Sequence, residues 1–378
     1  MKNFRKIIFW LHLCSGALAG IFIFVMCVTG ALIAFESNIL AWVESDQRYV
    51  QAPTENAPKL SVKEVLEKFL EKNPDAKPSS VTIQNDAKAA ISLSAGREGK
   101  FYINPYTAEI TGKGAEKWQK IFGFFESVHR WLALSGDART VGKSLNDAAN
   151  FLFLFLAVSG LYIWFPRKTA WRNFRAVLWF RRGLKGKARN FNWHNTIGFW
   201  SSLILMILTL TGVIISYQWA GNLLYTLTGN EPPQQQQRPP NQNEKQEFVV
   251  PENLNEIFEK AANHTNWQTI SLRFPISNDS ASFTVDEGVY WNRFGRSTLT
   301  IDTKTAEITK WESYGEQNAA RRLRSWARFT HTGETFGFIG QFIAFLACIG
   351  GAFLVWTGIS LALRRFQNWR TKNLVDGN

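Results

Sequence analysis

Hydrophobic residues in this 378-residue chain gather in four long runs, which are separated by longer polar segments. The runs cover about 7–35, 147–165, 196–219 and 337–363. About 20 helical residues cross the hydrocarbon core of a bilayer, so each run predicts a membrane-spanning helix. The first run continues past twenty apolar positions without a small-residue cleavage site, which favours a retained span over a removed signal peptide.

The two polar segments, 36–145 and 220–335, show the same order of patterns. Helical spacing at 60–73 and again at 250–263 precedes short alternating stretches that are typical of β-strands. The string TAEIT occurs in both segments, at 107–111 and at 305–309. Each segment is therefore predicted to form one helix on a small antiparallel sheet, an α+β module.

The apolar runs repeat as well. His12, Gly16, Thr29 and Gly30 in the first run are matched 182 positions later by His194, Gly198, Thr211 and Gly212. The second and fourth runs share Ser159-Gly160 and Thr357-Gly358. These matches predict a tandem duplication of a unit made of span, module and span.

The predicted fold is a membrane protein with a four-helix transmembrane bundle and two outer α+β modules. Its parts, in chain order, are a span at 1–35, a module at 36–145, a span at 146–166, a basic loop at 167–192, a span at 193–219, a module at 220–335, a span at 336–363 and a tail at 364–378. The second module contains a Pro/Gln-rich linker at 232–243, whose composition is typical of disorder.

The net charge of +13 comes from 43 Lys and Arg against 30 Asp and Glu. Nearly all of the excess lies in residues 1–10, in 166–193 and after 364, and each of these stretches adjoins an apolar run. This distribution fits the positive-inside rule and not a nucleic-acid surface, so no nucleic acid is expected as a partner. Both termini and the basic loop are predicted to be cytoplasmic, with the two modules on the opposite side.

Four of the five histidines lie near an end of a predicted span. His12 and His194 are at the cytoplasmic ends of the first and third spans, whereas His129 and His331 precede the second and fourth spans at the outer face. A histidine at an interface is often only an anchor, but two pairs at matching depths fit the axial ligands of two six-coordinate haems. The fifth, His264, is expected to be a surface residue.

Three kinds of residue are predicted to complete these cofactor sites. Gly16 and Gly198 follow His12 and His194 by four positions, so they share a helix face with them and leave room for a porphyrin. Arg130, next to His129, is among the basic residues placed to pair with haem propionates. No catalytic triad, paired carboxylate or GxGxxG loop is present, so the chemistry would belong to bound cofactor and the electron donor to another molecule.

The chain resembles the PepSY-associated transmembrane family over nearly its whole length. The resemblance rests on the four spans, the two TAEIT modules, HRWL at 129–132, HTGE at 331–334 and LYIWFPR at 161–167. It implies a multi-pass protein of the bacterial inner membrane, with two b-type haems and two periplasmic PepSY-like modules. By position, His12 and His194 would bind the iron of the inner haem, and His129 and His331 that of the outer haem.

The resemblance also implies an activity, that of a haem-dependent oxidoreductase which reduces ferric siderophores from Fe(III) to Fe(II). The expected partners are a ferric siderophore, the lipid bilayer, and either a membrane quinol or a cytoplasmic reductase as electron donor. The outer modules carry aromatic residues that would form a wall for the chelate, namely Trp267, Tyr290, Trp291 and Trp311. Two alternatives are a cofactor-free, membrane-anchored PepSY protein with a binding or regulatory role, and a transporter built from duplicated halves.

Overall fold

The computed structural model describes residues 2–54, 57–96, 99–166, 170–233, 250–277 and 279–375. All but two residues of the predicted linker at 232–243 lie outside these ranges. The chain divides into two compact units. The helical unit comprises Met1–Glu36, Lys120–Leu224 and Trp326–Asn378, and the sheet unit comprises Ser37–Gln119 and Tyr225–Ser325.

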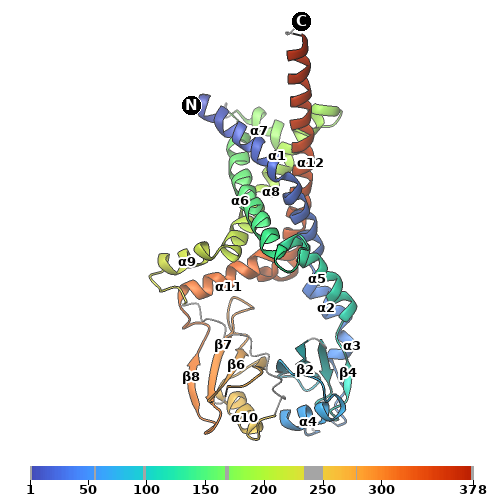
Figure 1. The fold of residues 1–378 in the computed structure, drawn as a ribbon, viewed down its shortest axis with the longest axis vertical. Coiled ribbons are helices and arrows are strands. Elements are labelled where there is room, and N and C mark those ends of the chain that lie inside the picture. Colours follow the sequence, from blue (N-terminus) through green and yellow to red (C-terminus); the bar gives the residue numbers. More distant parts are fainter. Residues whose placement is uncertain are drawn as a thin grey trace. The chain divides into compact units, whose positions relative to one another are not determined.

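Four long helices form the helical unit (Figure 1): α1 (Lys2–Ile33), α6 (Ala138–Trp164), α8 (Gly186–Ser216) and α12 (Gly337–Val375). Each contributes a segment long and apolar enough to cross a membrane. Helix α1 packs against α12 and α6, and α8 packs against the same two helices. Helices α1 and α8 therefore stand at opposite corners of a four-helix bundle, as do α6 and α12.

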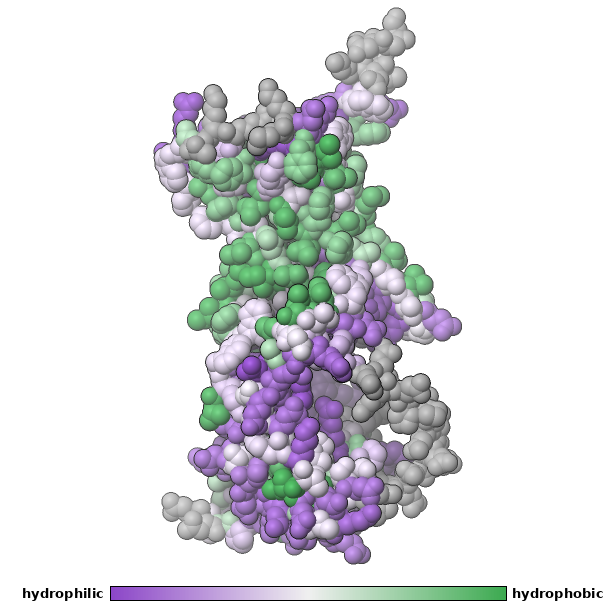
Figure 2. Space-filling view, turned by 90° about the vertical axis from the view of Figure 1, so that its left-hand side faces the viewer, coloured by the Kyte–Doolittle hydropathy of each residue, from purple (hydrophilic) through white to green (hydrophobic). Residues whose placement is uncertain are grey.

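The surface of this bundle is apolar. On the face drawn in Figure 2, hydrophobic residues form a broad band over the long helices, and large side chains such as Leu18 and Leu203 are 75% and 65% exposed. Water-soluble proteins rarely expose an apolar surface of this extent. The bundle interior is apolar as well, and it combines small side chains such as Ala19 and Ala347 with larger ones such as Phe153. This distribution is that of a membrane protein.

The helices extend beyond the predicted spans. Helix α6 begins at Ala138 instead of 146, α8 begins at Gly186 inside the predicted loop, and α12 continues to Val375 through most of the predicted tail. Hydropathy marks the part of a helix that lipid surrounds, whereas a helix ends where a breaker residue ends it. No Gly or Pro occurs between Gly358 and Val375, so α12 continues into its basic end.

Shorter helices flank the spans. Helix α5 (Glu116–Trp131) precedes α6, and α11 (Ala319–His331) with the 3-10 turn η2 (Glu334–Phe336) precedes α12. The others are α2 (Glu36–Val43), α3 (Ser45–Arg48), α7 (Trp171–Leu178) and α9 (Gln218–Leu227). Because α5 and α11 cross into the helical unit at Lys120 and Trp326, the sheet unit is shorter than the predicted modules 36–145 and 220–335.

The sheet unit contains one eight-stranded antiparallel sheet. Its strands are β1 (Ser80–Gln84), β2 (Ile91–Ser94), β3 (Lys100–Ile103), β4 (Ile110–Gly112), β5 (Thr269–Arg273), β6 (Ser280–Asp286), β7 (Ser297–Asp302) and β8 (Ile308–Glu312). Their order is β4-β3-β2-β1-β5-β6-β7-β8. Each half adds one helix, α4 (Val62–Lys72) or α10 (Leu254–His264). The content of each predicted module is present, but the two modules share a sheet.

The two halves join at their first strands. Strand β1 pairs with β5 around Thr82 and Ser271, whose hydroxyl oxygens are 2.6 Å apart. The amide of Lys63 on α4 donates to Asn255 Oδ1 on α10, with an N···O distance of 3.2 Å. Buried residues of both helices and both strand sets form one continuous hydrophobic cluster. The sequence pattern predicted each half, while this junction belongs to the tertiary structure.

The repeated TAEIT string forms the same turn in both halves. Ala108 and Ala306 have φ values of 59° and 52°, in the left-handed region, and both side chains are buried. In the first half, the backbone N–H of Asn104 donates to the carbonyl oxygen of Glu109. In the second half, the backbone N–H of Asp302 donates to the carbonyl oxygen of Glu307. A larger side chain would be strained at this φ and crowded by the core, which explains why small alanine recurs in both copies.

A buried carboxylate connects the segments of the first half. Glu44 is 2% exposed, and its carboxylate accepts hydrogen bonds from Arg48, from Tyr102 Oη at 2.7 Å and from the amide of Ala115 at 3.0 Å. Burial opposes ionisation of Glu44, but these bonds and nearby Lys100 hold its pKa below the ordinary value. Burial and the bond to Glu44 raise the pKa of Tyr102.

Replacing Glu44 with glutamine is expected to cost about 1–3 kcal/mol of local stability, because Arg48 and Tyr102 lose their charged acceptor. A carboxyl with a lowered folded pKa stabilises the protein above its unfolded pKa, near 4.3, and loses that contribution as the pH falls through the folded pKa. Hydrogen exchange of the β3 amides, corrected for intrinsic pH dependence, should show a variant effect at pH 7 that disappears in acid. Glu67→Gln, at an exposed carboxylate, is the control, and an effect that persisted in acid would contradict the assignment.

Candidate functional site

The structure brings His129 and His331 together. His129 lies near the end of α5 and His331 is the last residue of α11, and both side chains are half-buried. Their ring centroids are 6.3 Å apart, with 57° between the ring planes. Two imidazole nitrogens that bind one first-row metal ion at about 2.0–2.1 Å each stand about 4 Å apart, which puts the ring centroids about 6 Å apart. The observed spacing fits a pair of axial ligands.

His12 and His194 form the second candidate pair. They lie on α1 and α8, the helices at opposite corners of the bundle, and both are half-buried. Ligands on opposite corners approach a central group from opposite faces, which is the arrangement that bis-imidazole haem ligation requires.

The two pairs are separated along the bundle. His12 and Thr29 are 17 positions apart on α1, and His194 and Thr211 are 17 positions apart on α8. At 1.5 Å per residue this spacing is about 25 Å, close to the hydrocarbon thickness of about 30 Å. Thr29 and Thr211 contact the rings of His129 and His331, as described next, so the two pairs lie near opposite ends of the bundle.

Every one of the four rings is hydrogen-bonded through Nδ1 to a hydroxyl on a neighbouring long helix. His12 Nδ1 lies 2.8 Å from Ser159 Oγ on α6, and His194 Nδ1 lies 2.9 Å from Thr357 Oγ1 on α12. The Nδ1 atoms of His129 and His331 lie 2.9 Å and 3.2 Å from the hydroxyls of Thr29 on α1 and Thr211 on α8. The bond at Nδ1 leaves Nε2 as the nitrogen for a metal ion.

A glycine follows each of these hydroxyl residues, and each glycine faces the same histidine ring. A Cβ built on Gly160 would lie 3.1 Å from His12 Cε1, and one on Gly358 would lie 3.3 Å from His194 Cε1. The corresponding distances are 3.4 Å for Gly30 with His129 and 3.2 Å for Gly212 with His331. Side chains larger than hydrogen would push on the rings. Four copies of one local arrangement therefore hold the four histidines.

The other predicted site residues have different surroundings. A Cβ on Gly16 or Gly198 would meet only a leucine methyl, at 3.8 Å or 3.5 Å, so neither glycine contacts a histidine ring. Arg130 is exposed, donates to Glu126 Oε1 at 2.7 Å and stacks over Trp131. Its guanidinium therefore already has a partner within α5. The residues that contact the rings are the Ser-Gly and Thr-Gly pairs of the sequence repeats. The sequence repeats alone did not connect these pairs with the histidines.

Two asparagines on α6, the buried Asn146 and the half-buried Asn150, lie next to the His129–His331 pair. Asn146 Nδ2 donates to the carbonyl of His129 at 2.6 Å, and Asn150 Nδ2 donates to that of Thr209 at 3.1 Å. Neither residue was predicted to belong to the site, although two amides one turn apart in a predicted span are an unusual signal. Within the described part of the chain, no group of three or more His, Cys, Asp or Glu side chains could hold a metal ion.

The aromatic residues predicted to line a chelate site differ in exposure. Trp267 and Trp311 are partly buried against the core of the sheet unit, and Tyr290 donates to Glu287. Trp291 is 68% exposed. His264 is exposed and packs edge-on against Trp311, as expected for a surface residue. Trp291 is thus the member of the predicted wall that is open to a ligand.

The model of the PepSY-associated TM region matches residues 9–365. No curated protein matches the chain. The matched range covers most of each of the four long helices, and it includes the eight strands and the four histidines of the two pairs. The chain therefore belongs to the PepSY-associated TM region family.

Proposed function

We propose that this protein is a di-haem b electron-transfer protein that reduces ferric siderophores. His12 and His194 would hold one haem and His129 and His331 the other. The observation that carries this proposal is the 6.3 Å spacing of the His129 and His331 rings, combined with hydrogen bonds that engage Nδ1 in all four histidines.

Haem would supply one-electron redox chemistry at two levels of the membrane. The protein's own residues would set the conditions for it. The four imidazoles fix the two positions about 25 Å apart along the bundle, and apolar side chains keep water away from them. The proposed topology puts both termini in the cytoplasm, the sheet unit in the periplasm and the bundle in the bacterial inner membrane. The repeated element order of the two halves supports an origin by tandem duplication.

Reduction would release iron because Fe(II) has a lower charge and is softer than Fe(III), so hard oxygen chelators hold it less tightly. A ferric siderophore on the periplasmic side would then receive its electron from the His129–His331 end. Histidine ligation and substrate reduction are separate parts of this proposal and need separate measurements.

Visible absorption spectra test the haem part. Protein purified in detergent from haem-replete cells should show sharp α and β bands after dithionite reduction, with about two haems per chain. A ferric trihydroxamate added to the reduced protein should reoxidise these bands and release Fe(II) to a trapping dye. A colourless protein after haem supply would contradict ligation, whereas stable reduced bands in the presence of the chelate would contradict only the siderophore.

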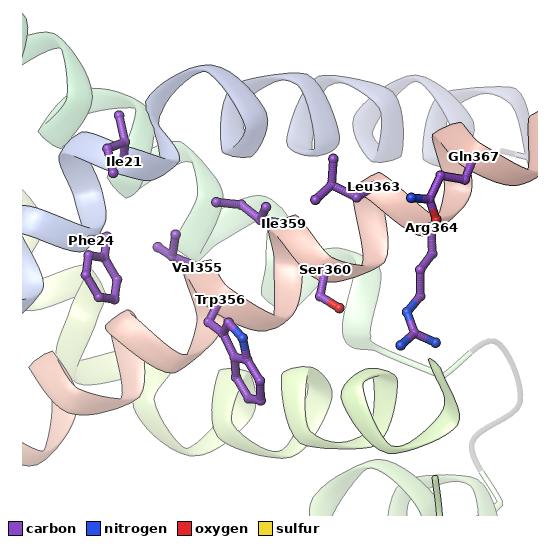
Figure 3. A pocket seen from close by; sticks show the side chains of 9 residues that line it. All are labelled: Ile21, Phe24, Val355, Trp356, Ile359, Ser360, Leu363, Arg364 and Gln367. Carbon is purple, nitrogen blue, oxygen red and sulfur yellow. The ribbon is translucent and has the colours of Figure 1, made fainter. Parts of the chain in front are cut away.

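A groove on the bundle supports a membrane quinol as the electron donor. It has a volume of about 480 Å³ and is lined by Ile21 and Phe24 of α1 and by seven residues of α12: Val355, Trp356, Ile359, Ser360, Leu363, Arg364 and Gln367 (Figure 3). Its walls are apolar along most of the length, which suits a prenyl tail, and Trp356 provides an aromatic face for a ring.

The polar end of the groove suits the oxygens of a quinol. Trp356, Ser360 and Arg364 point to one side of α12 (Figure 3). Ser360 accepts from Asn190 Nδ2 at 2.8 Å, and the buried Asn190 Oδ1 has no partner within the described residues. Trp356 also directly precedes Thr357, the partner of His194. Oxidation of one quinol to the quinone releases two protons and two electrons, one electron for each of the two proposed haems.

Replacing Trp356 with leucine is therefore expected to slow reduction of the protein by a short-chain quinol at least tenfold, because the aromatic wall is lost. The α-band absorbance after quinol addition measures this rate, and dithionite reduction shows that the haem content is unchanged. Trp369→Leu, an exposed tryptophan on the same helix outside the groove, is the matched control. Equal rates for the two variants would exclude the groove as the quinol site.

A further inference from the structure

We propose that Ser159, Thr29 and Thr357 are positioning residues, each of which holds its histidine in the tautomer with the proton on Nδ1, and that the carbonyl of Leu208 does the same for His331. The identity of the metal group rests on the proposed function. The tautomer does not, because it follows from hydrogen bonds within the protein.

Each of these threonine hydroxyls donates its single proton to a backbone carbonyl and cannot donate it to a histidine as well. Thr357 Oγ1 donates to the carbonyl of Phe353 at 2.7 Å, and Thr29 Oγ1 donates to that of Val25 at 2.7 Å. Such bonds to the preceding turn are the usual ones for threonine inside a helix. A hydroxyl that donates to a carbonyl can only accept from an imidazole. The Nδ1 atoms of His194 and His129 must therefore carry the proton.

The tautomer of His331 can be assigned without reference to any hydroxyl. Its Nδ1 lies 2.8 Å from the carbonyl oxygen of Leu208, which has no proton to donate. Thr211 Oγ1 also donates to a carbonyl, that of Ile207, at 2.7 Å. Nδ1 of His331 is thus the donor in both of its contacts, and Nε2 keeps its lone pair.

Among the four histidines, the tautomer and orientation of His12 depend most on the hydroxyl partner. Its Nδ1 bonds Ser159 Oγ at 2.8 Å, and Ser159 Oγ in turn lies 3.4 Å from the carbonyl of Leu156. Serine also lacks the methyl group that restricts the rotamer of threonine. Removal of this one hydroxyl therefore offers the clearest test of positioning, while His331, with its backbone carbonyl, is the built-in reference.

The glycine after each hydroxyl residue also helps to position the histidine ring. Because Gly160 has no side chain, the ring of His12 reaches the backbone of α6 and meets Ser159 at hydrogen-bond distance. The same holds for Gly358 with His194. A Ser-Gly or Thr-Gly pair on one helix is thus a complementary surface for one imidazole edge.

The Nδ1–H donation also raises the basicity of Nε2, which favours the ferric form and lowers the reduction potential of a bound haem.

The first test uses the haem-free full chain in detergent, with ¹⁵N-labelled histidine. The ¹⁵N signals of His12 are those that disappear in the His12→Ala variant. Their chemical shifts should identify the Nδ1–H tautomer in the wild type. Ser159→Ala should abolish this preference, and Ser159→Thr should restore it. Thr211→Val should leave His331 as Nδ1–H, because the Leu208 carbonyl remains. An Nε2–H tautomer of His12 in the wild type, or no change in Ser159→Ala, would overturn the proposal.

The second test uses the haem-loaded protein. Ser159→Ala should lower haem affinity at the His12–His194 pair 10- to 100-fold, the usual effect of losing such a partner, and should raise the reduction potential of that haem. Ser202→Ala is the matched control, because Ser202 is a buried serine whose hydroxyl, among the described residues, donates to the preceding turn at the carbonyl of Phe199. Unchanged affinity and potential in Ser159→Ala would contradict a positioning role. If no variant binds haem at all, the proposed function fails while the tautomer result still stands.

Discussion

Replacing His331 with alanine is expected to reduce the haem content from about two per chain to about one. His331 and His129 face each other at 6.3 Å, and an iron that loses one of two imidazoles loses its six-coordinate state. The haem of the His12–His194 pair should remain, because the two pairs are about 25 Å apart along the bundle. Pyridine haemochrome measurement against protein concentration gives the ratio.

The same variant should abolish electron transfer to a ferric chelate even though one haem remains. The lost haem would stand between the remaining haem and the proposed periplasmic side, so the electron would have to cross most of the membrane in one step. His264→Ala, at an exposed histidine of the sheet unit, is the control and should retain both haems and full activity. Two haems in His331→Ala would exclude this residue as a ligand.

Replacing Gly160 with valine is expected to have the second largest effect, the loss of the other haem. The added Cβ would lie 3.1 Å from His12 Cε1, closer than ordinary contact, and the branched methyl groups would come closer still. The ring would be pushed away from Ser159 and out of its position for ligation. Overpacking of this kind costs about 1–3 kcal/mol, so the fold is expected to survive.

The spectrum should then show one haem, bound by His129 and His331, and the reduced α band should fall by about half. Circular dichroism checks that the helices are retained. Gly123→Val is the matched control, because a Cβ on Gly123 meets nothing within 4 Å. Retention of both haems in Gly160→Val would show that the ring of His12 can move without losing its ligand, which would contradict the close packing described above.

Local patterns in the sequence predicted much of this structure. Uninterrupted apolar runs identified the four spans, because lipid requires them, and alternating residues around the TAEIT strings identified the strands. The 182-position repeat that relates His12 and His194 indicates matching depths for these two residues from their spacing alone. These features depend on residues close together in the chain or on a constant offset along it, so a linear pattern records them.

Other features could not be read from the chain. His129 lies far ahead of its apolar run, and the separate helix α5 is what returns it to the bundle beside His331. The union of two modules in one sheet depends on which edge strands meet, and β1 and β5 have no local feature that selects this pairing.

The sequence by itself determined the membrane-spanning character, the strand content and the four histidines, because hydropathy and periodicity are properties of neighbouring residues. The tertiary structure alone decided which side chains meet. Ser159 reaches His12, and Thr29 reaches His129, only because helices pack side by side and bring together residues more than 90 positions apart. Helix packing, and not spacing along the chain, therefore orients these imidazoles, and the Ser-Gly and Thr-Gly pairs could be recognised as their partners only in three dimensions.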